Sequence, residues 1–412
     1  MSATDFALFR HRPFVSFWLG RVFTSMSNNM LAVAVGWQMY DLTHSAMDLG
    51  LVGLVQFAPA LLLTLVVGHV ADRYDRRKII TLCLALQTLV IGVLIASTHY
   101  DWISRDLILF CSLLIGTAKA FQMPTQQALA PLVVPIEVLP RAMAMSSSGV
   151  QFAIIVGPAF GGFLYATGAN TVYSLCCALT LISAICFLTV KIDHKPAARE
   201  PATLRSIFAG LDFIWHRKAV LGAISLDLFA VLLGGATALL PIFARDILFV
   251  GPVGLGMLRS APAVGALTTS IWLARKPIQR RVGKVMFGAV AIYGVATLVF
   301  AFSKVFLLSL VALVITGAAD MVSVVIRQSL VQLETPNEMR GRVSAVNSIF
   351  IGASNQLGEF ESGTTAALWG AVTSVAIGGI GTLVVVAAWM KNFPELTKRE
   401  RLVQGAASEP AR

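Results

Sequence analysis

Eight ionisable side chains fall inside long apolar stretches of this 412-residue chain, or close to the ends of those stretches. A charge in hydrocarbon costs about 3 kcal/mol or more, so it is retained where it faces water or a partner. Carboxyl groups in such a place can bind and release protons. The four acids are Asp227, Asp320, Glu359 and Glu361, and the four bases are Arg21, Lys119, Arg259 and Arg327. We expect the functional site among these eight residues.

The composition determines which elements must position these side chains. Hydrophobic residues make up 57% of the chain and charged residues only 13%, too few polar residues to cover a soluble protein of this size. A membrane-spanning helix needs about 20 mostly apolar residues. The sequence therefore predicts an all-α membrane protein with twelve transmembrane helices, at about 13–40, 47–70, 79–98, 106–130, 141–164, 172–190, 219–245, 253–274, 284–302, 305–331, 342–364 and 366–390.

One stretch of the sequence is written twice. Adding 201 to the number takes Gln127 to Gln328, Pro135 to Pro336, Glu137 to Glu338, Arg141 to Arg342, Gly157 to Gly358 and Gly162 to Gly363. A constant offset of about half the chain indicates duplication. Because both copies run in the same sense, we expect two pseudo-symmetric halves related by an axis along the membrane normal.

A polar linker separates the two halves. We predict an N-terminal bundle over 1–190, a cytoplasmic linker over 191–218, a C-terminal bundle over 219–390 and a cytoplasmic tail over 391–412. Within the linker, Leu204, Phe208, Leu211 and Trp215 recur at helical spacing beside charged residues. This pattern predicts an amphipathic helix that lies on the membrane surface.

The basic residues behind the net charge of +11 are distributed unevenly between the two predicted sides of the membrane. With a cytoplasmic N-terminus, the predicted inner segments carry most of the Lys and Arg, and the outer loops carry only Arg105, Arg245 and Lys304. Both termini are therefore expected in the cytoplasm. The basic residues punctuate apolar segments and form no patch suited to nucleic acid, so we expect the lipid bilayer, and no nucleic acid, as a partner.

Cysteine and histidine placement argues against a metal site or an enzyme. All five cysteines fall inside apolar segments, and none of the six histidines lies well inside a predicted span. We therefore expect no disulfide framework, no metal, no cofactor and no catalytic residue. A sensor or assembly subunit is a weaker alternative. Such a protein should carry a sizeable soluble domain, whereas this sequence offers only the linker and a short polar tail.

The repeat places several candidate residues relative to one another. Lys119 and Asp320 are equivalent under the offset, and so are Gln126 and Arg327. Seven residues separate the members of each half, which puts them on one helical face. We expect Lys119 and Asp320 to face each other or a shared cavity. The alternative is a static ion pair that satisfies two buried charges.

Two predicted helices carry polar faces. The helix over 342–364 has a wide polar sector that includes Asn355 and Glu359, and Glu361 lies some distance round the helix, where it could face water at the outer mouth. The first helix has a narrower stripe of Arg21, Ser25 and Asn28. These asparagines could contact a ligand or form hydrogen bonds between helices. The predicted substrate and proton cavity comprises Lys119, Asp320, Arg327, Glu359, Asn355, Asn28, Arg21 and Asp227.

Two local motifs resemble those of a known family. The stretch with Gly68, Asp72, Arg73, Arg76 and Arg77 resembles the major facilitator superfamily signature Gly-x-x-x-Asp-Arg-x-Gly-Arg-Arg-x, with Asp75 in place of its second glycine. The alternative is that these arginines only set the orientation of the chain in the membrane. The matching region after the eighth span keeps basic residues but lacks the acid. Any contacts that the acid and arginines of the signature make between helices should therefore differ between the two halves.

The second motif lies in the fifth predicted span. Gly157, Pro158, Gly161 and Gly162 resemble the Gly-Pro-x-x-Gly-Gly motif that the superfamily associates with antiporters. A proline bends a helix and glycines allow a neighbour to approach closely. Lys119 with Gln122 resembles the family's Arg-x-x-Gln element only faintly, because Lys replaces Arg and Met123 stands where glycine would follow.

Three further stretches resemble the branch that contains bacterial enterobactin exporters and drug-exporter-like proteins: Trp37–Thr43, Val134–Glu137 followed by Arg141, and Asn347–Gly363. The resemblance covers essentially the whole chain. This resemblance implies two six-helix bundles around a cavity that opens alternately to either side, in the bacterial inner membrane. It also implies export driven by the proton gradient. We expect a functional monomer that exchanges a small amphiphilic molecule, such as a siderophore or drug, for protons. Asp320 or Glu359 is the expected proton carrier, because poor hydration raises the pKa of a carboxyl group. The alternative within transport is an uncoupled or lipid-type permease.

Overall fold

The chain is helical throughout the described residues, which in the computed structural model are 11–63, 66–67, 70, 73–135, 137–190 and 204–402. It forms two compact units. Unit 1 comprises 1–202 with 237–260, and unit 2 comprises 203–236 with 261–412. The predicted division into bundles, linker and tail stays a prediction.

Eight helical stretches of the described chain are long and apolar enough to cross a membrane. They are Arg76–His99, Arg105–Leu132, Leu139–Tyr165, Ala169–Thr189, Lys218–Ile247, Val282–Phe302, Phe306–Glu334 and Ala371–Asn392. Four further helices match predicted spans but are shorter or more polar: α2 (Arg12–Thr43), α3 (Ala46–Leu62), α12 (Gly251–Arg275) and α15 (Arg340–Trp369). The all-helical class is thus confirmed, whereas the count of twelve spans stays a prediction.

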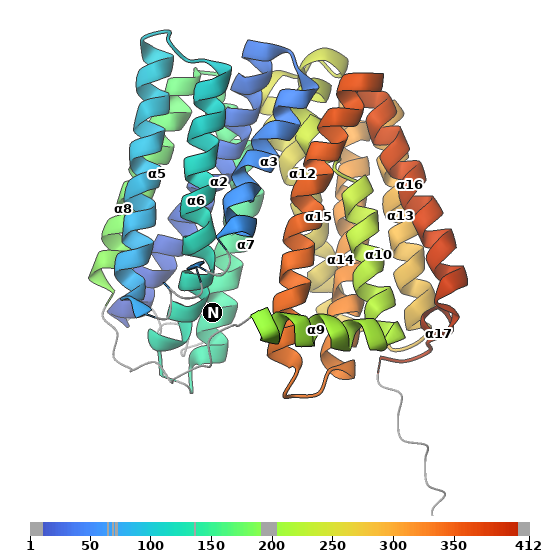
Figure 1. The fold of residues 1–412 in the computed structure, drawn as a ribbon. Coiled ribbons are helices and arrows are strands. Elements are labelled where there is room, and N and C mark those ends of the chain that lie inside the picture. The colour runs from blue at the N-terminus through green and yellow to red at the C-terminus, as the bar shows by residue number, and fades with distance from the viewer. Residues whose placement is uncertain are drawn as a thin grey trace, which may run out of the picture. The chain divides into compact units, whose positions relative to one another are not determined.

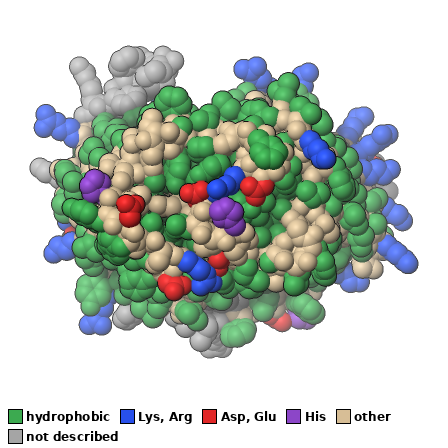
Figure 2. Space-filling view, turned by 90° about the horizontal axis from the view of Figure 1, so that it is seen from above, with side chains coloured by type: hydrophobic (Ala, Val, Ile, Leu, Met, Phe, Trp, Pro, Cys, Tyr) green, Lys and Arg blue, Asp and Glu red, His purple; other side chains and the backbone are tan. Residues whose placement is uncertain are grey.

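Large hydrophobic side chains remain exposed on many of these helices, including Leu82, Phe110 and Leu307. Figure 2 views one end of the helices, where acidic, basic and histidine side chains gather in small groups among hydrophobic and other side chains. A soluble monomer rarely leaves so many large hydrophobic side chains in water, so the exposed sides of these helices fit a lipid environment.

In unit 1, α2 packs against α7 (Leu139–Tyr165) and α8 (Ala169–Thr189), and α5 (Arg76–His99) packs against α6 (Arg105–Leu129) and α8. Hydroxyl groups join α2 to α8, with Thr24 Oγ1 2.6 Å from Ser183 Oγ and Ser27 Oγ 2.9 Å from Thr180 Oγ1. These polar residues satisfy one another between helices. They also explain why α2 is less apolar than a helix that faces lipid alone.

In unit 2, α13 (Val282–Phe302) packs against α14 (Phe306–Glu334) and α16 (Ala371–Asn392), and α10 (Lys218–Leu233) packs against α15 and α16. Its core includes Leu226, Met286, Phe287 and Leu330, all nearly inaccessible to solvent. The core also takes in Leu396 of the short helix α17 (Pro394–Thr397). The chain beyond α16 therefore contributes to the packing of unit 2.

Two pairs of helix starts and one pair of glycine contacts follow the sequence offset in the two units. Helix α6 begins at Arg105 and α14 at Phe306, and α7 begins at Leu139 and α15 at Arg340, the same offset of 201 as in the sequence. A Cβ added to Gly116 of α6 would collide with the backbone of Gln56 in α3. The equivalent Gly317 of α14 is pressed in the same way against the backbone of Pro262 in α12. The repeated glycines thus serve equivalent close approaches of helices within each unit.

The predicted span 219–245 is not one regular helix. Helix α10 ends at Leu233, before Gly234 and Gly235, and a 3-10 turn (Ala236–Leu239), a short α11 (Leu240–Ile242) and a π-turn (Phe243–Ile247) follow. Two successive glycines weaken the helix, and Pro241 cannot donate to the preceding turn. The predicted span therefore agrees with the helical stretch Lys218–Ile247, and apolar composition alone does not reveal the break within it.

The predicted boundary between the last two spans was misplaced. Helix α15 continues to Trp369 instead of ending near 364, and Gly370, with φ 87°, separates it from α16. A positive φ of this size favours glycine, which explains why the turn is located there.

Helix α9 (Leu204–His216) forms within the predicted linker and lies across the ends of other unit 2 helices (Figure 1). One side packs against α15, where Gly210 approaches the carbonyl of Arg342 and Ile214 is buried with Val343 and Val346. Phe208, Leu211 and Trp215 remain exposed and share a face by their spacing. The helix itself is as expected, and its contact with the membrane surface stays a prediction.

The close approach at Gly317 predicts a sharp difference between two glycine substitutions. Gly317→Ala should lower the free energy of unfolding by about 1 to 3 kcal/mol, because its Cβ overlaps a backbone carbonyl. Gly288→Ala in α13 is the matched control, since nothing lies within 4 Å of an added Cβ there, and it should be neutral or stabilising by up to about 1 kcal/mol. Denaturant unfolding of the purified protein in detergent measures both, and equal stabilities would contradict the packing.

The exposed face of α9 predicts contact with lipid. Trp215 is 69% exposed, so in nanodiscs its fluorescence should be quenched by lipids brominated near the headgroup. The Trp215 signal is obtained as the difference between the wild-type protein and Trp215→Phe. No quenching of that difference signal would show that the face is turned to water.

Candidate functional site

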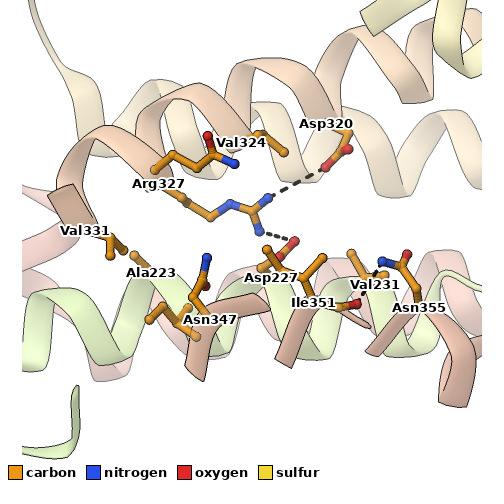
Figure 3. Close-up of a pocket in the computed structure, with 12 residues that line it drawn as sticks. Ala223, Asp227, Val231, Asp320, Val324, Arg327, Val331, Asn347, Ile351 and Asn355 are labelled. Atoms are coloured by element: carbon orange, nitrogen blue, oxygen red, sulfur yellow. Dashed lines mark hydrogen bonds and ion pairs between the residues drawn. The ribbon is translucent and has the colours of Figure 1, made fainter. Parts of the chain in front are cut away.

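A cavity of about 210 Å³ lies within unit 2, between α10, α14 and α15. Twelve residues line it: Ala223, Ile224, Asp227, Val231, Asp320, Val324, Arg327, Gln328, Val331, Asn347, Ile351 and Asn355. Apolar side chains cover part of the wall, and charged and amide groups converge on the rest (Figure 3). This mixture is typical of a small-molecule site.

Arg327 is the central charge of the cavity. Its Nη1 pairs closely with the carboxylate of Asp227, and its Nη2 lies 3.8 Å from Asp320 Oδ1 (Figure 3). The Arg327 and Asp227 side chains are only 9% and 15% exposed, whereas Asp320 is 48% exposed. The guanidinium is thus bound firmly to one acid and loosely to the other. One positive and two negative charges leave an excess negative charge in the cavity when both acids are ionised.

Helical spacing explains how these groups meet. Asp320 and Arg327 are two turns apart on the same face of α14, and Asp227 faces them from α10. Small and apolar neighbours such as Ala223 and Val324 leave space around the charges without competing for them. The arrangement joins α10 to α14 through an ion pair across the interior of the unit.

Amide side chains complete the polar wall. Asn347 and Asn355 come from α15 and Gln328 from α14. Asn355 Nδ2 donates to the carbonyl of Ile351 at 2.8 Å, which leaves its amide oxygen as an acceptor toward the cavity. The wall can therefore offer both charge and neutral hydrogen bonds to a ligand.

The structure brings four of the eight predicted cavity residues together: Asp227, Asp320, Arg327 and Asn355. Glu359 is half-buried one turn beyond Asn355 and is not part of the cavity lining. Glu361, considered as an outer-mouth residue, accepts a hydrogen bond from Thr365 Oγ1 at 2.7 Å. These two acids therefore have different surroundings from the pair at Arg327.

The remaining predicted cavity residues belong to unit 1. Lys119 lies in α6, with its Nζ 3.4 Å from Gln56 Oε1 in α3. Arg21 donates to Ser146 Oγ of α7 at 2.7 Å and lies over the ring of Phe17. Asn28 is half-buried on α2. Lys119 and Asp320 belong to different units, and the cavity predicted between them stays a prediction.

Comparison with known proteins covers nearly the whole chain. A family model described as transmembrane secretion effector matches residues 3–409. The enterobactin exporter EntS of Citrobacter koseri is 26% identical over 392 residues, which cover 94% of this chain and 93% of the relative. The enterobactin exporter EntS of Shigella boydii serotype 18 is 27% identical over 379 residues, which cover 91% and 90%.

The chain belongs to the transmembrane secretion effector family. Solved structures agree on the fold: a bacterial homologue of the human lysosomal transporter Spinster gives a TM-score of 0.72 at 14% identity, over 93% of this chain and 96% of that one. The nucleoside transporter NupG gives 0.66 at 16% identity, over 92% and 99%. The resemblance to the major facilitator superfamily is thereby confirmed, and this family member is a multi-pass membrane transporter.

The family signature has a visible structural role in unit 1. Arg76 Nη1 donates to the carbonyl of Ala128 near the end of α6, at 3.1 Å, and Arg77 Nη1 donates to the carbonyl of Val190 after α8, at 3.0 Å. Helix C-termini present unpaired carbonyls and a partial negative charge, which arginines satisfy. Arg73 is exposed. Gly68 and Asp72 lie outside the described residues, so their predicted roles stay predictions.

Asp75, the departure from the family pattern, caps α5. Its carboxylate accepts from the Arg77 backbone N–H at 2.9 Å and pairs with the Arg77 side chain at 2.8 Å. These hydrogen bonds hold the pKa of the Asp75 carboxyl below its usual value. A lowered pKa means that this contribution to stability is present at neutral pH and is lost as the pH falls through the pKa of the folded state.

In unit 2 the corresponding place is held by the C-terminal segment. The backbone N–H groups of Val282 and Gly283 at the start of α13 donate to the carbonyls of Glu400 and Arg399. Arg399 is buried and pairs with Glu334 at the end of α14, at 2.6 Å. The two units thus stabilise this region by different contacts.

The Gly-Pro motif of α7 lies against two helices, α2 and the N-terminal part of α12. Added Cβ atoms at Gly157 and Gly161 would meet Asn29 and Met30 of α2, whereas one at Gly162 would meet the carbonyl of Pro252 at the start of α12. Gly256 of α12 in turn meets the carbonyl of Pro158. The motif therefore lets α7 approach two helices on different sides, as glycines in membrane helices do.

Several polar residues that were not predicted from the sequence lie beside the charged residues of the cavity or form a buried ion pair. Tyr293 of α13 and Ser323 of α14 lie beside Asp227 and Asp320. A single tyrosine in the apolar run of α13 was the available signal, because its hydroxyl requires a partner when buried. In unit 1, buried Asp48 pairs with Arg105 at 2.6 Å. Among the described residues, no group of His, Cys, Asp or Glu is suited to hold a metal ion.

The unequal sharing of Arg327 predicts unequal effects of removing each acid. Asp227→Asn should lower the free energy of unfolding by about 3 kcal/mol, because it breaks a buried ion pair. Asp320→Asn should change it by less than about 1 kcal/mol, because that carboxylate is half exposed and farther from the guanidinium. Denaturant titration in detergent measures both values, and the reverse order would show that Asp320 is the structural partner.

Proposed function

We propose that this transporter is a proton-coupled exporter that exchanges a small amphiphilic molecule for protons by alternating access, with Asp320 as the first candidate for the proton carrier. The observation that carries the proposal is the buried Arg327, paired with Asp227 and only loosely associated with a second, half-exposed acid in the wall of a cavity. Such an acid can exchange protons without the loss of the main ion pair.

The charge balance supports coupling. With Asp320 ionised, the Asp227, Arg327 and Asp320 group carries one net negative charge, and with Asp320 protonated it is neutral. The two states favour different occupants of the cavity, because Coulomb attraction is strong where water is scarce. A ligand and a proton that both respond to this charge can be exchanged for one another.

The cavity volume bears on the substrate. Sites for drug-sized ligands measure about 300 to 1,000 Å³, and the unit 2 cavity, at about 210 Å³, is smaller. It would therefore hold one portion of such a molecule, with apolar contacts from Val231 and Ile351 and hydrogen bonds from Asn347 and Asn355. Similarity to enterobactin exporters supports a siderophore-like substrate, and a drug or dye is the main alternative.

The same proposal includes the topology. The eight apolar helical stretches together with α2, α3, α12 and α15 give twelve spans, six before α9 and six after it. The common offset of 201 in helix starts and glycine contacts supports two pseudo-symmetric bundles. We also propose a functional monomer in the bacterial inner membrane with both termini in the cytoplasm. The distribution of Lys and Arg supports this orientation, and the similarity to enterobactin exporters supports the membrane.

Transport by proteoliposomes with an imposed pH gradient tests the proposal. A panel of siderophores, dyes and antibiotics first identifies a transported compound. Asp320→Asn should then reduce gradient-driven transport by about tenfold or more, while exchange of labelled for unlabelled substrate without a gradient persists. Glu359→Gln is the second candidate, and Glu361→Gln, whose carboxylate is held by Thr365, is the control expected to retain transport.

Two outcomes would contradict the proposal. Full gradient-driven activity in both Asp320→Asn and Glu359→Gln would exclude these acids as carriers. Wild-type transport that is indifferent to the pH gradient would instead favour an uncoupled or lipid-type permease.

A further inference from the structure

A second, much smaller cavity shares the Asp227, Arg327 and Asp320 group. It offers about 10 Å³ and lies between α10, α13 and α14, where Tyr293 and Ser323 complete its polar wall. The larger cavity has α15 as its further wall, through Asn347, Ile351 and Asn355. The three charged residues therefore line both cavities, the larger one toward α15 and the small one toward α13.

Ser323 is the informative residue of the small cavity. Its side chain is 1% exposed, and its Oγ has no hydrogen-bond partner among the described residues. A buried hydroxyl without a partner costs about 1 to 3 kcal/mol, and nearly all buried polar groups in proteins are satisfied. Ser323 therefore indicates a polar ligand in this cavity.

Size and chemistry identify that ligand. A cavity holds one water molecule when it provides roughly 10 to 15 Å³ and two to four polar partners. The Ser323 hydroxyl and the carboxylates of Asp227 and Asp320 supply those partners. The Tyr293 hydroxyl donates to the Gly234 carbonyl at 3.3 Å, and its oxygen can still accept a hydrogen bond from the water. A metal cation is less suited, because the guanidinium of Arg327 lines the same space and repels it.

We infer that the small cavity binds one water molecule, which connects Ser323 and Tyr293 to the Asp320 carboxylate and passes the exchanged proton to it from the α13 side. The inference rests on the proposed proton-coupled function. The water accepts a proton from the aqueous phase and gives one to the carboxylate, so the water is regenerated and Asp320 becomes the neutral acid.

This arrangement separates the path of the proton from that of the substrate. A ligand that fills the larger cavity covers Asp320 from the α15 side, yet the water on the α13 side keeps the carboxylate in contact with a proton donor. Among the described residues of unit 2, the charged or titratable groups that face Asp320 are Arg327 on its own helix, Asp227 on α10 and Tyr293 on α13.

Infrared spectroscopy after a rapid drop in pH tests the water site on the purified, full-length protein without any substrate. The carbonyl band of protonated Asp320 is assigned by its loss in Asp320→Asn, and its rate of appearance is measured. Ser323→Val fills the cavity with methyl groups and should slow that rate by about tenfold or more, with little change in final amplitude. Tyr293→Phe removes the second hydroxyl and should also slow it.

The matched control is Thr316→Val. Thr316 lies two turns before Ser323 on the same face of α14, and its hydroxyl is already bonded to the carbonyl of Leu313 at 2.7 Å. It should protonate Asp320 at the wild-type rate.

Wild-type rates in both Ser323→Val and Tyr293→Phe would overturn the water site while leaving Asp320 as the proton carrier. A wild-type carboxyl band that shifts with sodium ions at constant ionic strength, but not in Ser323→Val, would replace the water with a cation. Absence of any Asp320 band in the wild-type protein would instead overturn the proposed function.

Discussion

The interior of unit 2 depends on one guanidinium that lies between two carboxylates and pairs closely with only one of them. A buried arginine without a partner would destabilise the bundle by several kcal/mol, so Arg327 requires at least one of them. Asp227 meets that requirement, because the two side chains are in direct contact and largely buried. Asp320 is then free of the structural task, and its carboxylate can change its charge while the helices stay joined.

The different roles of Asp227 and Asp320 follow from the helices on which they lie. Asp227 lies on α10, so its pair with Arg327 crosses from one helix to another, whereas Asp320 and Arg327 share α14. A change at Asp320 alters the field in the cavity without breaking a contact between helices. The larger cavity and the small one both adjoin the same group, so a single charge is felt on both sides.

Close packing of glycines holds the helices that carry this group. Gly317 brings α14 against α12, and Gly358 brings α15 against the carbonyls of Val231 and Leu232 in α10. The same approach recurs in unit 1 at Gly116 and Gly157. Van der Waals contact of this kind replaces the hydrophobic driving force that is absent between helices in lipid.

The sequence predicts much of this fold because its signals are local. Apolar length located the helices, and the offset of 201 paired Gly157 with Gly358, each of which lies against a neighbouring helix. Spacing on α14 also placed Asp320 and Arg327 on one face. These inferences need only the period of a helix.

Contacts between helices were harder to predict. Nothing local in the sequence indicates that Asp227 of α10 meets Arg327, that Ser146 receives Arg21, or that Tyr293 approaches the acids from α13. Each of these pairs depends on the rotation of one helix against another, which the packing of many residues decides. The break after Leu233 was missed for a related reason, since Gly234 and Gly235 are common residues in apolar spans.

The chain passes between the two units at particular residues. The backbone changes unit three times, after 202, after 236 and after 260, and the last two changes fall inside helical stretches instead of in loops. Of these two, the first follows the Gly234 and Gly235 pair, and the second immediately precedes Pro262, the proline inside α12. Each of these two changes of unit therefore coincides with a local weakness of the helix, a glycine pair or a proline, where regular backbone hydrogen bonding is interrupted.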